Sequence, residues 1–161
     1  MLKASSALAS AKPYVSTQLT IIEAPDFTLT QYAGAEKDLK KALGKLPTRV
    51  GIVQDNLLRV SPTQIWSLNE AVDAPNCFVT PLSSSRTRIE ISGAPARDVL
   101  AKCAAIDFHK SAFKAGTFAM TGIHHVPVLI HCSAGEIFHL YVLRTFALSI
   151  WDHVTDAALE F

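Results

Sequence analysis

The sequence predicts an α+β fold in which helices pack on a mostly antiparallel sheet. Short β-type segments, sparse amphipathic helices and the absence of an internal repeat support this class. With 161 residues, the chain has the length of one ordinary domain or of two small halves that share a core. We expect a flexible N-terminal segment over residues 1–16 and a single domain over 17–161, with halves at about 17–76 and 77–161.

The first half begins with two predicted strands, at residues 17–23 and 27–32, where polar and apolar residues alternate. Apolar side chains then recur at helical spacing over residues 34–43, and Gly44 and Pro47 supply a stop signal. A short amphipathic helix is therefore expected between the strands.

Residues 50–60 predict a hairpin, because the turn-forming pair Asp55 and Asn56 separates two apolar pieces. An extended segment is expected at 65–68. Residues 69–77 have the composition of a loop and mark the expected boundary between the halves. The first half thus has a short β-α-β arrangement.

The second half opens with a predicted strand at 83–92. Its pattern places Ser85, Thr87, Ile89 and Ile91 on one face and Ser84, Arg86, Arg88, Glu90 and Ser92 on the other. A turn at 93–95 leads into a helix expected at 96–105. Strand, turn and helix therefore follow one another directly.

Residues 106–116 predict a loop anchored by Phe108 and Phe113. Three β segments are expected after it, at 116–124, 125–132 and 137–143. The final segment, 144–161, carries apolar residues at helical spacing and predicts a closing helix. The second half is therefore β-α-β-β-β-α.

Composition excludes several classes of protein. Fifteen Lys and Arg against 14 Asp and Glu give a net charge of +1, which argues against a nucleic-acid partner. The apolar runs are too short to span a membrane. Charged residues make up only 18% of the chain and the mean hydropathy is +0.24, so we expect part of the surface to face other protein.

Three cysteines, Cys77, Cys103 and Cys132, are odd in number and widely spaced. A disulfide framework is therefore not expected, and the cytoplasm is the predicted location. His124, Cys132 and Cys103 are candidate zinc ligands, but they lack the short spacing of metal motifs. Surface or interface histidines are the alternative interpretation.

Candidate catalytic groups are equally sparse. The serine run 83–85 lacks the Gly-x-Ser-x-Gly elbow of a nucleophile. Asp107 and His109 could form an acid/base pair, or Asp107 could turn the chain while Phe108 packs inward. We favour the structural interpretation, and we expect no catalytic, cofactor-binding or metal-binding residue in this chain.

Arg86 and Arg88 project from one face of the predicted strand beside Glu90. Two such guanidinium groups can bind a carboxylate bidentately. They can also form a solvated face or pair with acids across a subunit interface, which is the interpretation we favour.

Several segments resemble the gamma subunit of heterotetrameric sarcosine oxidase. They are residues 80–93, 96–109, 113–116, 121–125 and 144–151. One departure is local: Ala94 separates Gly93 from Pro95, where the family has a Gly-Pro turn. The resemblance implies a fold similar to part of the glycine-cleavage T-protein, an aminomethyltransferase that binds tetrahydrofolate.

The resemblance also implies partners and cofactors outside this chain. In such an oxidase, the alpha subunit binds NAD and tetrahydrofolate, beta carries FAD and FMN, delta holds zinc, and gamma has no cofactor. The assembly oxidatively demethylates sarcosine to glycine, transfers the one-carbon unit to tetrahydrofolate and produces hydrogen peroxide.

Two alternative functions are retained. One is the small subunit of a related N-methyl amino acid dehydrogenase, such as N-methylglutamate dehydrogenase. The other is a free-standing folate-binding domain in which Arg86 or Arg88 holds a carboxylate.

Overall fold

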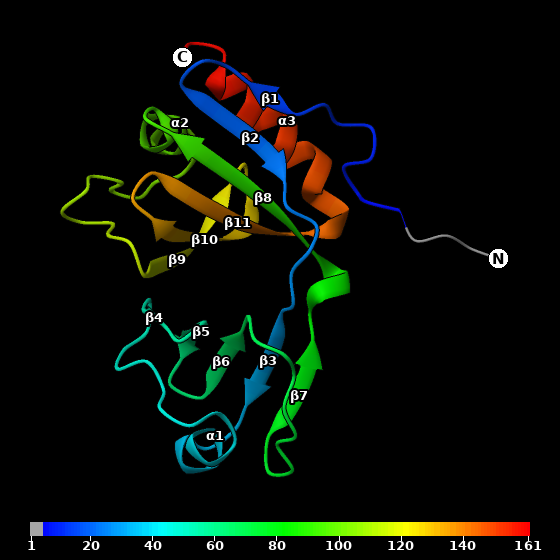
Figure 1. Cartoon of the computed structure of the whole chain (residues 1–161), viewed down its shortest axis with the longest axis vertical. Helices are drawn as coiled ribbons and strands as arrows, with labels where there is room; N and C mark the ends of the chain where they lie inside the picture. Colours follow the sequence, from blue (N-terminus) through cyan, green and yellow to red (C-terminus); the bar gives the residue numbers. More distant parts are fainter. Residues whose placement is uncertain (1–4) are drawn as a thin grey trace.

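The computed structural model describes residues 5–161, which form two antiparallel sheets with helices on their outer faces (Figure 1). The larger sheet contains, in spatial order, β1 (Tyr14–Val15), β2 (Leu19–Glu23), β8 (Arg86–Gly93), β11 (Ile137–Leu143), β10 (Val126–Ala134) and β9 (Thr117–Ile123). The smaller sheet contains β4 (Val53–Gln54), β5 (Leu57–Ser61), β6 (Gln64–Ser67), β3 (Thr30–Ala33) and β7 (Phe78–Pro81). Every pairing within both sheets is antiparallel, which confirms the predicted fold class.

The helices confirm the periodic segments of the sequence. They are α1 (Glu36–Leu43), α2 (Ala96–Cys103) and α3 (Ala147–Ala158), with short 3₁₀ turns η1 (Ser83–Ser85) and η2 (Arg144–Phe146). The predicted closing helix therefore begins as a 3₁₀ turn. No helix within residues 5–161 is long and apolar enough to cross a membrane.

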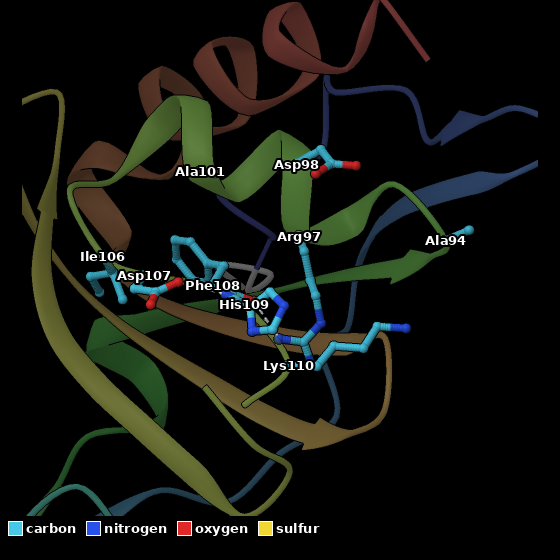
Figure 2. A pocket seen from close by; sticks show the side chains of 9 residues that line it. All are labelled: Ala94, Arg97, Asp98, Ala101, Ile106, Asp107, Phe108, His109 and Lys110. Atoms are coloured by element: carbon cyan, nitrogen blue, oxygen red, sulfur yellow. Dashed lines mark hydrogen bonds between the residues drawn. The ribbon is translucent and has the colours of Figure 1, made fainter. Parts of the chain in front are cut away.

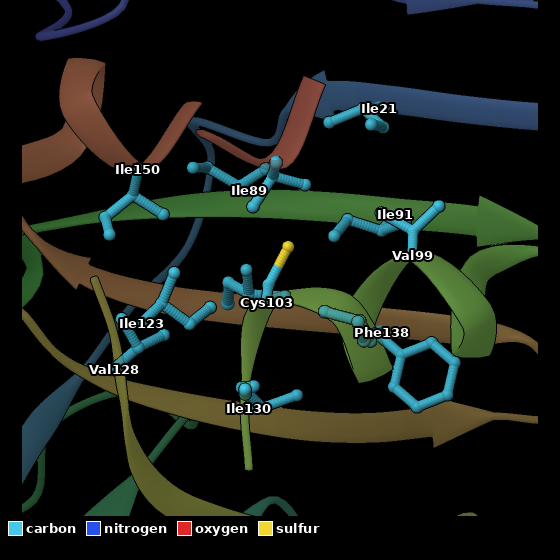
Figure 3. Packing of buried hydrophobic residues seen from close by; sticks show 14 of the residues in the cluster. Ile21, Ile89, Ile91, Val99, Cys103, Ile123, Val128, Ile130, Phe138 and Ile150 are labelled. Atoms are coloured by element: carbon cyan, nitrogen blue, oxygen red, sulfur yellow. The ribbon is translucent and has the colours of Figure 1, made fainter. Parts of the chain in front are cut away.

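The main core lies between the larger sheet and the helices α2 and α3 (Figure 3). As predicted, Thr87, Ile89 and Ile91 of β8 point into this layer and are buried. Val99 of α2 and Ile150 of α3 pack against the same cluster. Burial of these aliphatic side chains is the dominant favourable contribution to folding of this layer.

The smaller sheet has its own core on the face covered by α1. Tyr32, Leu39 and Ile65 are fully buried there. A third cluster joins the two sheets and includes Leu58 and Trp66 from the smaller sheet. Phe118, Leu129 and Tyr141 of the larger sheet complete it. Side chains of both sheets therefore meet on the larger sheet's helix-free face.

The smaller sheet is an insertion within the larger one. All of its strands lie between residues 24 and 85, whereas β2 and β8 on either side pair with each other. The expected boundary between halves, near residue 76, falls inside this insertion. The division between the two sheets therefore does not coincide with the predicted halves. The strand β7, just after that point, belongs to the smaller sheet.

Part of the expected flexible segment 1–16 packs against the body of the protein. Leu8 is buried in the main core, and β1 pairs with β2. The Tyr14 hydroxyl donates a hydrogen bond to the Ala158 carbonyl, 2.9 Å away. Residues 1–4 of that predicted segment lie outside the described residues.

The predicted turn at Asp55 and Asn56 is confirmed, since it joins β4 to β5 with φ angles of 53° and 62°. Left-handed backbone at two consecutive positions is the geometry of a tight hairpin. His124 and His125, between β9 and β10, adopt the same geometry with φ angles of 47° and 67°.

We predict that Gly93→Ala destabilises the fold by about 3 kcal/mol. Gly93 has a φ of +129°, and a Cβ atom there would lie 2.0 Å from the Gln18 carbonyl oxygen. The matched control is Gly135→Ala, where φ is +39° and no atom lies within 4 Å of the added methyl. The control should lose only about 1 kcal/mol in urea unfolding. Equal losses would show that the close approach at Gly93 is unimportant.

Candidate functional site

The polar face of β8 turns away from the helices and toward the smaller sheet. The Arg86 guanidinium lies 5.6 Å from the Trp66 ring centroid, and that of Arg88 lies 5.1 Å from the Phe27 ring. Both contacts are of the cation–π type. The predicted division into an apolar and a polar face is therefore confirmed for residues 86–92, whereas Ser84 and Ser85, expected in the same strand, lie in the 3₁₀ turn η1.

Arg88 is fixed by the backbone that leaves β2. Its Nε donates to the Ala24 carbonyl at 3.1 Å, and one Nη donates to the Asp26 carbonyl at 2.9 Å. A hollow of about 530 Å³ lies beside it, lined by Pro25, Asp26, Phe27, Thr28, Leu68 and Arg88. Arg88 thus holds the start of the inserted segment against the larger sheet.

The Arg86 guanidinium makes longer hydrogen bonds than that of Arg88. Its guanidinium makes two hydrogen bonds, both 3.4 Å long, to the carbonyl and hydroxyl of the adjacent Ser85. Among residues 5–161, Arg86 forms no ion pair. Burial lowers the pKa of this guanidinium. The two arginines, similar in sequence, therefore have different surroundings.

A row of polar side chains continues from β8 across the larger sheet. His139 of β11 pairs with Glu90 of β8 and with His131 of β10, and Tyr141 pairs with Arg88. The buried Nδ1 atoms of both histidines and the Tyr141 hydroxyl lack a hydrogen-bond partner within residues 5–161. The Nδ1 atom of His139 lies 3.9 Å from a carboxylate oxygen of Glu90, which is too far for a hydrogen bond.

The pKa values along this row follow from burial. Burial lowers the pKa of His131 to about 4, and the neighbouring His139 acts in the same direction. The pKa of His139 is lowered by burial and by Arg88, against the opposing effect of Glu90. Burial raises the pKa of Tyr141, and Arg88 opposes it. Both imidazoles are therefore neutral at neutral pH.

The candidate zinc ligands lie in different surroundings. His124 is in the turn between β9 and β10, with its ring centroid 5.2 Å from that of His153. The Cys132 sulfur lies 3.9 Å from an Nη atom of Arg97. Cys103 lies in the main core, where burial raises its thiol pKa to about 11. Across the described part of the chain, His, Cys, Asp and Glu side chains form no group of three suited to a metal.

Asp107 has a structural role. Its carboxylate accepts a hydrogen bond of 2.8 Å from the backbone N–H of His109, whereas the His109 ring contacts Ser111 at 2.7 Å. Phe108 is buried. These contacts confirm the predicted turn and do not form an acid/base pair. In the serine run, the Ser83 hydroxyl accepts a 2.9 Å hydrogen bond from the Leu29 N–H.

Sequence reasoning missed Arg97, which lines a hollow of about 450 Å³ beside α2 (Figure 2). Its guanidinium donates to Glu136 at 2.9 Å and to three backbone carbonyls. These belong to Phe108 at 2.6 Å, Phe113 at 2.9 Å and Gly135 at 2.8 Å. Arg97 therefore ties the loop before β9 and the β10–β11 turn to α2, and its donors are occupied.

Large apolar side chains are also exposed on the surface. Among residues 5–161, Phe78 of β7 is the most exposed of these, at 82%. The other residues of β7, an edge strand of the smaller sheet, are exposed too. Exposed apolar groups at a sheet edge are typical of surfaces that other proteins cover.

Comparison with solved structures defines the class of fold. The chain is similar to heterotetrameric sarcosine oxidase from Corynebacterium sp. U-96 in complex with pyrrole 2-carboxylate, with a TM-score of 0.86 and 21% identity over 98% of this chain and 96% of that one. It is also similar to glycine cleavage system aminomethyltransferase T from Bartonella henselae, with a TM-score of 0.61 and 11% identity over 85% of this chain and 45% of that one. The chain therefore shares its fold with the first structure over nearly its whole length and with somewhat less than half of the second. A comparison with curated proteins gave no significant match.

Comparison of the sequence with models of protein families identifies the family of this chain. The sarcosine oxidase, gamma subunit family matches residues 67–160, which is more than half of the sequence. The chain belongs to this family.

We predict that Arg97→Ala lowers the free energy of unfolding by about 3 kcal/mol, because it removes the donor to one carboxylate oxygen of Glu136 and to three backbone carbonyls. Arg97→Lys should lose less, since one ammonium replaces part of the hydrogen bonding. Lys110→Ala is the control: its side chain, 74% exposed, also binds Glu136, at 2.8 Å. Chemical unfolding should show little change for the control. An Arg97→Ala variant with an unchanged free energy of unfolding would contradict the assigned role.

We predict a pH-dependent stability that depends on His131. Its pKa of about 4 in the folded chain lies below the ordinary value of 6.5, so the unfolded chain binds the proton more readily. Stability should fall as the pH drops from about 6.5 to 4, by up to about 3 kcal/mol. In His131→Leu this part of the loss should vanish. Unfolding at pH 8, where residue 131 is uncharged in both proteins, controls for packing, and an unchanged acid profile would refute the assignment.

Proposed function

We propose that this chain is a non-catalytic structural subunit of a heterotetrameric, flavin-dependent sarcosine oxidase complex. The complex would oxidatively demethylate sarcosine to glycine, transfer the one-carbon unit to tetrahydrofolate and produce hydrogen peroxide. The observation that carries this proposal is the match to the gamma subunit family over residues 67–160. Its partners would be the alpha, beta and delta subunits, in the cytoplasm, with FAD, FMN, NAD, tetrahydrofolate and zinc held by those chains.

The internal use of the polar groups supports a structural role. Arg97 and Arg88 donate to backbone carbonyls of their own chain, and Asp107 holds a turn. These groups position segments of the fold, and their hydrogen bonds are already made within it. The surface offers exposed apolar side chains such as Phe78, which is the chemistry of a protein contact.

Co-expression tests the proposal. We expect the tagged chain to co-elute with three other subunits as one species by size exclusion with mass measurement, and flavin absorbance to appear in that species. The isolated chain should carry no flavin absorbance and should not oxidise sarcosine. A chain that stays monomeric beside the three subunits, or that oxidises sarcosine alone, would refute the proposal.

The same preparation separates the alternative functions. Sarcosine oxidation with release of hydrogen peroxide supports the oxidase, whereas turnover of another N-methyl amino acid without peroxide would identify the related dehydrogenase. Titration of the isolated chain with tetrahydrofolate tests the folate-binding alternative. Tight binding that Arg88→Ala or Arg86→Ala abolishes would favour it.

A further inference from the structure

The surface around Phe78 and Arg86 has a defined geometry. Trp66, Gln31 and Thr80 are successive cross-strand partners in β6, β3 and β7, so their side chains share one face of the smaller sheet. The Trp66 indole N–H donates to the Gln31 side chain at 3.0 Å. Phe78, two residues before Thr80 on the same strand, lies on this face as well.

Arg86 lies over the Trp66 ring at one end of this row. Two strand spacings of about 4.8 Å separate Trp66 from Thr80, so the row is about 10 Å long. On this face, the side chain of Gln31 is partly exposed, and those of Thr80 and Phe78 are exposed. The face therefore combines a half-buried cation at one end with an exposed aromatic side chain at the other, and we call it the Phe78–Arg86 face.

The edge of β7 restricts how a partner could bind. The Leu82 N–H donates to the Leu29 carbonyl at 2.7 Å, which fixes the alternation of hydrogen-bonded pairs between β3 and β7. The backbone groups of Val79 and Pro81 then point outward. Because Pro81 has no N–H, only a short stretch of this edge can accept another strand. Side-chain contacts on the face are favoured over strand addition.

We propose that the Phe78–Arg86 face binds a segment of another subunit that places a carboxylate on Arg86 and an apolar side chain against Phe78. This inference rests on the proposed function. Charge complementarity carries it, because Arg86 is partly desolvated and forms no ion pair among the described residues. Arg–carboxylate pairs are frequently bidentate, and their charge-assisted hydrogen bonds are stronger than those between neutral groups. Aromatic and Arg side chains are also the commonest energetic anchors of interfaces.

The test uses the co-expressed complex. Dilution with mass photometry measures the Kd for dissociation of this chain from the other subunits. Phe78→Ala and Arg86→Ala should each raise the Kd at least about tenfold. Arg86→Ala should also flatten the salt dependence of the Kd, because it removes a charge pair. Arg86→Lys should fall between the wild type and Arg86→Ala.

Controls separate binding from folding. Val15→Ala, at an apolar residue 71% exposed on β1, and Arg49→Ala, at an exposed arginine, should leave the Kd within about twofold. Thermal midpoints of the isolated variants report folding, and Phe78→Ala should leave the midpoint unchanged because the side chain is 82% exposed.

The outcomes separate this inference from the proposed function. If the wild type forms the complex and both variants bind with unchanged Kd, the Phe78–Arg86 face is not the interface, and the proposed function stands. If the wild type forms no complex, the proposed function itself fails. If the isolated chain dimerises and Phe78→Ala makes it monomeric, the face binds a second copy, which also overturns the inference.

Discussion

The antiparallel pairing of β8 with both β2 and β11 is the interaction on which the two-sheet arrangement depends. The pairing of β2 with β8 closes the inserted segment 24–85 at its two ends. At that closure, the Ala24 N–H donates to the Arg88 carbonyl at 2.9 Å, and the Arg88 side chain returns a hydrogen bond to the Ala24 carbonyl. The backbone and one side chain therefore fix together where the smaller sheet begins.

Local patterns predicted the elements well and their assembly poorly. The alternation in β8 and the turn at Asp55 and Asn56 follow from neighbouring residues, so the sequence alone indicates them. The pairing of β2 with β8 joins residues more than 60 positions apart, and no local pattern reports it. The same limit applies to β7, whose four residues are all exposed and so lack an alternation between buried and exposed positions.

The residues of the candidate site also divide into those that the sequence indicates and those that only the fold brings together. Asp107 was predicted as a turn residue because its hydrogen-bond donor lies two positions away, at His109. Arg97 could not be recognised, since three of its acceptors are backbone carbonyls of residues 11 to 38 positions away and the fourth is the Glu136 side chain, 39 positions away. Backbone acceptors are present at every residue and leave no signature in the sequence. Arg86 and Arg88 formed one motif in the sequence, and the structure distinguishes them by their hydrogen bonds: Arg88 donates to the Ala24 and Asp26 carbonyls, whereas Arg86, within the described part of the chain, reaches only Ser85.

Arg86 links the stability of the folded chain to the proposed contact with another subunit. A guanidinium that loses part of its hydration without gaining an acid raises the free energy of the folded state. Arg88 avoids this cost by donating to two carbonyls, whereas the hydrogen bonds of the Arg86 guanidinium among residues 5–161 are two long ones to Ser85. A residue in this state gains more from a carboxylate than a fully hydrated surface arginine does, because less water remains to be displaced. The low charge fraction of the sequence points the same way: charged side chains are few, and Arg86, one of them, is half-buried with no acidic partner in the part of the chain that the structure describes.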